Sequence, residues 1–111
     1  MEPATISLHM SNVETIPGKT ITASLGLVTG STVRSKNVFK DIGAGLKNLV
    51  GGELKAYTQL LQEARNEALQ RMMMQAHSMG ANGLVNIRFA TSNVAAGASE
   101  LFSYGTSVVL E

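Results

Sequence analysis

Residues 53–79, ELKAYTQLLQEARNEALQRMMMQAHSM, are the segment from which the predicted fold follows. Apolar residues recur there every three or four positions, which places them in one stripe along a helix, with Gln and Glu mostly on the other side. The stripe comprises Tyr57, Leu61, Ala64, Ala68, Met72, Ala76 and Met79. Glu53 suits the positive end of the helix dipole, and Gly80 suits the left-handed residue after a helix C-terminus. We therefore expect one long amphipathic helix over 53–79.

Upstream of this helix, the sequence predicts one strand and one short helix. Residues 20–28 alternate between apolar and polar side chains, and Thr29–Gly30 is expected to break the strand. Its apolar face carries Ile21, Ala23, Leu25 and Leu27. Residues 35–50 have the apolar spacing of a short helix, with Ser35 as its N-cap, and two glycines follow them. Residues 1–19 form a variable N-terminal segment that allows one short strand.

Downstream of the helix, two more alternating segments predict an antiparallel pair of strands. In the first, 84–89, one face carries Val85, Ile87 and Phe89. In the second, 102–110, one face carries Phe102, Tyr104, Thr106, Val108 and Leu110. The element order is then strand, helix, strand, strand. The predicted fold class is α+β, a two-layer sandwich with an antiparallel sheet and one long helix, in a single domain over 1–111.

The composition favours contacts between subunits. Of 111 residues, 44% are hydrophobic and 15% are charged, so little charge is available to cover the surface of a monomer. The predicted helix covers one face of the sheet and leaves the other face and the edges open. A second copy of the chain is the simplest cover, so we expect the partner to be the chain itself, in a homo-oligomer.

Charge and cysteine content limit the other partners and the compartment. The chain has no cysteine and a net charge of +1, and no apolar run approaches the roughly 20 residues that span a bilayer. We therefore expect a cytoplasmic protein without a membrane partner. Asp41 interrupts the basic residues near the first helix, and no exposed aromatic residue accompanies them for base stacking, so we expect no nucleic-acid partner.

Several separated blocks resemble the YbjQ-like family. They are FKDIGAGLKNLVGG (39–52), Tyr57, Ala64–Arg65, MGANGLV (79–85) and Gly105–Thr106, and the resemblance runs from about Leu27 to the C-terminus. The resemblance implies a dodecin-like strand-helix-strand-strand subunit in a ring-shaped homopentamer. Members often carry a heavy-metal-binding label, although their biochemical function is not established. This chain has Glu53 where the family often has a basic residue, which argues against an anion site at the helix start.

Metal binding can be tested against the donor residues of the chain. Zinc and copper sites need Cys, His or carboxylate ligands, and the two histidines are His9 and His77. His77 follows Met73 by four residues, so the two share a helix face and, with Met74, could hold a soft ion such as Cu(I). Alternatively, Leu69, Met73 and His77 form an apolar seam for a neighbouring subunit. A transition metal is the one cofactor that the sequence leaves open.

Catalysis finds no support in the residue pattern. The sequence suggests neither a Ser-His-acid set nor paired carboxylates, and the glycines of 26–31 lack the lysine of a phosphate-binding loop. We therefore expect that the protein is not an enzyme. The leading hypothesis is a homo-oligomeric assembly or small-ligand binding module, and the alternative is a heavy-metal-binding protein.

Overall fold

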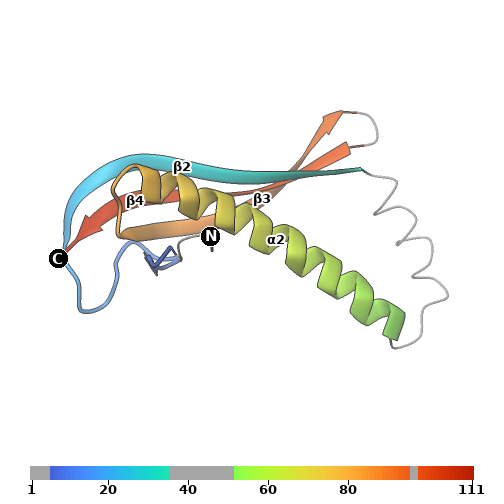
Figure 1. Ribbon diagram of the computed structural model, residues 1–111, viewed down its shortest axis with the longest axis horizontal. Coiled ribbons are helices and arrows are strands. Elements are labelled where there is room, and N and C mark those ends of the chain that lie inside the picture. Colours follow the sequence, from blue (N-terminus) through green and yellow to red (C-terminus); the bar gives the residue numbers. More distant parts are fainter. Residues whose placement is uncertain (1–5, 36–51, 96–97) are drawn as a thin grey trace, which may run out of the picture.

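The computed structural model describes residues 6–35, 52–95 and 98–111, which form one helix and four strands (Figure 1). In chain order these are β1 (His9–Met10), β2 (Ile21–Ser35), α2 (Gly52–Ser78), β3 (Gly83–Ala95) and β4 (Ala98–Leu110). The predicted order of strand, helix, strand, strand is confirmed for β2, α2, β3 and β4. The helix predicted over 35–50 lies outside the described residues, except for Ser35, which ends β2.

The four strands form a single mixed sheet in the order β1-β3-β4-β2. Both β2 and β3 pair with β4 antiparallel, whereas β1 pairs with β3 parallel. The prediction of a purely antiparallel sheet is therefore wrong. The physical reason is that the N-terminal segment takes up the outer backbone groups of β3, through His9 N–H to Asn82 O at 3.1 Å and Ser11 N–H to Leu84 O at 2.9 Å.

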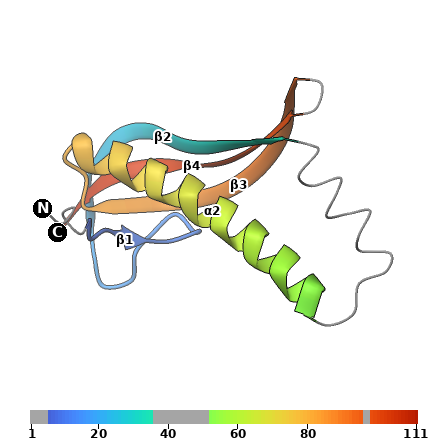
Figure 2. The same cartoon turned by 45° about the vertical axis from the view of Figure 1, so that its right-hand side comes forward.

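Helix α2 covers one face of the sheet. Every fourth residue of its central and C-terminal turns is fully buried, namely Ala64, Ala68, Met72 and Ala76, and this stripe packs on β2 and β4. The first turns of α2 lie away from the sheet in both views (Figures 1 and 2). The predicted bounds of the helix are confirmed to within one residue.

The C-terminus of α2 ends as the sequence predicts. Gly80 has a φ of 87°, the left-handed conformation that glycine adopts without strain. Its N–H donates to His77 O at 3.0 Å, and Ala81 N–H donates to Ala76 O at 3.1 Å. These two bonds are those of a Schellman motif, which satisfies the last carbonyls of the helix.

Strand β2 continues through Gly30, where a break was predicted, and reaches Ser35. The glycine is there because the helix backbone lies directly above it: a Cβ at Gly30 would clash with the carbonyl oxygen of Ala68 and the amide nitrogen of Met72. From β4, Ser103 Oγ donates to the same Ala68 oxygen at 3.0 Å. Gly30 therefore marks close helix-to-sheet packing and not a turn.

A β-bulge in β3 changes which residues face the helix. The register with β4 shifts between Val85 and Arg88, and Asn86 has a φ of 55°. As a result Leu84 and Ile87 both pack in the cluster under α2, whereas Val85 belongs to a cluster on the other face. The prediction that Val85, Ile87 and Phe89 share a face is therefore wrong for Val85.

The same kind of irregularity separates two leucines of β2 that were predicted to share a face. Register shifts with β4 occur between Ile21 and Ala23 and between Ser24 and Gly26. Leu25 consequently packs against the cluster under the helix, whereas Leu27 is 67% exposed. The alternation of apolar and polar residues does not reveal these bulges. A bulge adds one residue to a strand, and this extra residue can be of the same type as its neighbours.

The N-terminal segment covers part of the sheet face opposite the helix, where no cover was predicted. Ile16 is buried there with Val85, Val108 and Leu110. Thr20 and Glu111 exchange two backbone hydrogen bonds of 2.9 Å, which tie the end of this segment to the C-terminus. No helix in the described part of the chain is long and apolar enough to cross a membrane.

Candidate functional site

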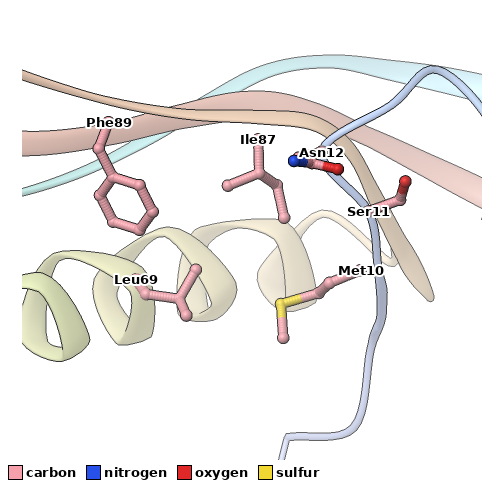
Figure 3. Close-up of a pocket in the computed structure, with 6 residues that line it drawn as sticks. All are labelled: Met10, Ser11, Asn12, Leu69, Ile87 and Phe89. Atoms are coloured by element: carbon pink, nitrogen blue, oxygen red, sulfur yellow. The ribbon is translucent and has the colours of Figure 1, made fainter.

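A shallow groove lies between α2, β3 and the N-terminal segment (Figure 3). Its volume is about 210 Å³, and it is lined by Met10, Ser11, Asn12, Leu69, Ile87 and Phe89. Figure 3 shows the side chains of Leu69, Ile87, Phe89 and Met10 around the same space. None of the six lining residues is an acid, a base or a thiol. The groove can therefore receive a small apolar group, with the polar side chains of Ser11 and Asn12 at one wall.

The β3 bulge holds the N-terminal wall of this groove in place. Asn86 N–H donates to Val13 O at 2.9 Å, and Ile87 N–H donates to Ser11 O at 3.2 Å. Arg88 Nη1 adds a bond of 2.5 Å to Asn12 O. The backbone amides of Asn86 and Ile87 and the side chain of Arg88 thus bind the backbone carbonyls of Ser11 to Val13 and fix this wall.

The residues that the sequence singled out as a site differ in their exposure. Leu69 is half-buried and lines the groove, and Met73 is 7% exposed within the core cluster under α2. His77, in the last turn of α2, is exposed. The structure thus directs Met73 inward and leaves His77 accessible. The assignment of these residues to a metal site or to a subunit seam stays a prediction.

The donor set of the chain fits only some metal ions. No three His, Cys, Asp or Glu side chains gather in the described ranges 6–35, 52–95 and 98–111, and the whole sequence contains no cysteine. Structural zinc sites use four such ligands in a tetrahedral arrangement. Met74, which is 58% exposed, lies three residues before His77, and thioether and imidazole are donors that soft ions accept.

The two outer edges of the sheet differ in whether their backbone N–H and C=O groups have hydrogen-bond partners. On β2, Gln75 Oε1 accepts from Thr29 N–H at 2.8 Å, and Arg71 Nη1 donates to Ser31 O. Side chains of α2 therefore satisfy backbone groups that would otherwise remain available to another strand. On β3, the alternation of the ladder turns the backbone groups of Phe89 and Thr91 outward, and no described residue partners them.

The sheet face opposite the helix exposes apolar side chains beyond the cover of Ile16. Leu27 is 67% exposed, Val33 54% and Tyr104 36%. The Phe102 and Tyr104 rings lie next to each other on β4, with centroids 5.9 Å apart. This surface, formed by Leu27, Val33, Phe102 and Tyr104, is called the open face below.

Sequence reasoning missed the contribution of the N-terminal segment to the groove. Met10, Ser11 and Asn12 line it, although residues 1–19 were predicted only to allow a short strand. Asn86 was the available signal, because Asn is one of the few residues that adopt positive φ readily. The role of Asn86 in the groove depends on its hydrogen-bonding partner, Val13, in the segment from Ser11 to Val13, which is distant in sequence.

The chain is similar to proteins whose function is not described. A family model named YbjQ_1, with the description "Putative heavy-metal-binding", matches residues 8–111. A UPF0145 protein of Hahella chejuensis is 66% identical over 102 residues, which cover 92% of this chain and 98% of the relative. A UPF0145 protein of Acinetobacter baylyi is 62% identical over 96 residues, which cover 86% of this chain and 89% of the relative.

A solved structure supports the fold. It is a crystal structure of a protein of unknown function from Pediococcus pentosaceus that belongs to the DUF74 family, with a TM-score of 0.60. The match covers 94% of this chain and 98% of that chain at 15% sequence identity, so it bears on the fold alone.

Proposed function

The chain belongs to the YbjQ_1 family, and we propose that it is a self-assembling binding module whose open face and open sheet edge contact other copies of the chain. The observation that carries the proposal is the open face, where Leu27 and Val33 of β2 and Tyr104 of β4 expose apolar area on one face of the sheet. Burial of apolar area stabilises association by about 25 cal/mol per Å² before the entropy cost of binding.

A contact between the open β3 edge of one copy and the open face of the next copy would join unlike surfaces, which gives a ring and not a symmetric pair. The β2 edge is satisfied at Thr29 and Ser31 by its own helix, whereas the β3 edge is open at Phe89 and Thr91 in the described part of the chain. Such a heterologous contact forms a ring when the rotation between neighbouring copies closes, and an open filament when it does not. The pentamer implied by the family resemblance is the ring that we propose.

We further propose that the protein binds a ligand without catalysing a reaction and that it acts in the cytoplasm. The groove between α2, β3 and the N-terminal segment carries no acid or base among its lining residues. Its small apolar volume suits a ligand group or a side chain, not a reaction.

Native mass spectrometry of the wild type and of Leu27→Glu tests the assembly. We expect a single oligomer for the wild type and dissociation for the variant, because a charge in an apolar contact loses its hydration. Gln62→Glu, at an exposed position of α2, is the control and should leave the oligomer intact. A wild type that remains monomeric at micromolar concentration would refute self-assembly.

Metal binding is the second candidate function, favoured by the family description and by the exposed donors Met74 and His77. Calorimetric titration of the purified chain with Zn(II), Ni(II) and Ag(I) tests it. We expect stoichiometric binding of at least one of these ions, and heat signals equal to buffer for all three would remove this candidate.

A further inference from the structure

We propose that the metal is a soft monovalent ion, Cu(I) or Ag(I), held between the Met74 thioether and the His77 imidazole on the exposed side of the last turns of α2. This inference rests on the metal-binding candidate above and adds the class of ion and the residues that hold it. It follows from the donors of the chain, from their burial and from the rigid end of the helix.

The available donors exclude most other classes of site. Thiolate sites need cysteine, and the chain has none. Borderline and hard divalent ions need several imidazoles or carboxylates together, and no such group of three occurs among the described residues. Glu67 and Glu100 already bind Arg71 and Ser92. The thioether of Met74 and the imidazole of His77 are exposed donors on the same part of α2, and a thioether selects soft ions.

The packing of α2 distinguishes the two methionines next to His77. Met73 and Met74 are four and three residues before His77, so either could lie beside it on the helix surface, where such positions are about 5–6 Å apart between Cβ atoms. Met73 is 7% exposed and packs with Val28 and Leu84, whereas Met74 is 58% exposed. Only Met74 therefore has its sulfur available next to an exposed histidine.

The end of the helix holds this pair in position. The carbonyl of His77 accepts from Gly80 N–H at 3.0 Å, so the residue belongs to the ordered Schellman turn and not to a fraying end. The methionine side chain is long and flexible, which lets its sulfur follow an ion bound to the imidazole. The Schellman turn thus fixes the backbone from which the His77 side chain extends, and the Met74 side chain can adapt to the position of the imidazole.

The charges around the pair suit a single positive charge better than a double one. Both donors are neutral when they bind a metal, so they offset none of the ion's charge, and a monovalent ion leaves less uncompensated charge than a divalent one. Arg71, one turn before Met74, is the nearby cation on α2, and Glu67 pairs with it at 2.5 Å. Arg71 also donates to Ser31 O, which directs it toward β2.

The test is a titration of the intact protein with Ag(I), a monovalent ion without redox chemistry under these conditions. The variants Met74→Leu and His77→Gln each remove one donor, while Met79→Leu and His9→Gln are controls with the same chemistry at other exposed positions. Affinity is measured by competition with a chromophoric chelator, and the methionine methyl signals are followed by NMR. Circular dichroism checks that every variant is folded.

We expect the methyl signal of Met74 to shift with Ag(I), and both Met74→Leu and His77→Gln to weaken binding at least about tenfold, since even an outer-shell partner costs 10- to 100-fold in metal affinity. The two controls should bind as the wild type does. If either donor variant keeps wild-type affinity, the proposed site is wrong, although metal binding stands. If the protein binds Zn(II) or Ni(II) but not Ag(I), the proposed ion class is wrong. If it binds none of them, the metal-binding candidate fails as well.

Discussion

At the scale of single residues, Gly30 determines how closely α2 approaches the sheet. The helix backbone at Ala68 and Met72 occupies the space of its missing Cβ, and Ser103 Oγ bonds to the Ala68 carbonyl from the neighbouring strand. The other contacts in this layer come from small helix residues, including Ala64 and Ala76. Small side chains on both layers allow the two backbones to touch, and that contact buries Met72 completely.

Gly30→Ala should therefore lower the free energy of unfolding by about 1–3 kcal/mol, the usual cost of overpacking a close contact. The clash is with backbone atoms, which cannot rotate away as the end of a side chain can. Urea unfolding followed by circular dichroism measures the change. Thr29→Ala is the control, because its exposed side chain should change stability by less than about 0.5 kcal/mol. Equal midpoints for the two variants would show that helix and sheet are further apart than described.

At the scale of elements, α2 both covers the sheet and closes one of its edges. Its buried stripe faces β2 and β4, while Arg71 and Gln75, on the flank of the helix, reach over the outer edge of β2. An uncovered edge strand is a template for uncontrolled pairing with other chains. The helix thus leaves the β3 edge as the place where the sheet can be extended.

Gln75→Leu should open the β2 edge at Thr29. The amide of Thr29 donates to Gln75 at 2.8 Å, and the loss of this bond should accelerate hydrogen exchange at that amide with a stability change of about 0.5–1.5 kcal/mol. Exchange measured residue by residue by NMR tests this. Gln70→Leu alters an exposed glutamine of the same helix and should leave Thr29 unaffected. Unchanged exchange at Thr29 in the Gln75 variant would mean that the helix does not protect this edge.

At the scale of the whole molecule, the N-terminal segment packs on the sheet formed by the later strands. It adds the parallel strand β1 to β3, forms one wall of the groove and inserts Ile16 under the opposite face of the sheet. The family match begins at residue 8, so this segment belongs to the family pattern. Truncation of Ile16, the buried residue of this segment, should therefore lower the stability of the whole fold and not only loosen the N-terminus.

Ile16→Ala tests this role. The side chain is 9% exposed among Val85, Val108 and Leu110, and truncation of a buried isoleucine costs about 2–5 kcal/mol. We expect a value near the lower limit, because one side of the residue faces the surface of the molecule. Thermal unfolding by calorimetry measures the loss. Val13→Ala, at a residue 54% exposed, should change little. A melting temperature unchanged in both variants would show that the segment is a loose appendage.

The sequence by itself determined the long helix, its C-cap at Gly80 and the order of the main strands, because periodicity and capping depend on neighbours within a few residues. The sequence also identified Met73, Met74 and His77, on one helix, as candidate metal donors. Tertiary structure decided the parallel pairing of β1, the bulge at Asn86 and the tight packing at Gly30, since each depends on a segment distant in sequence. It also decided the burial of Met73 and the exposure of Met74. Both lie next to His77 in any helix, and only the way α2 rests on the sheet turns one inward and the other to solvent.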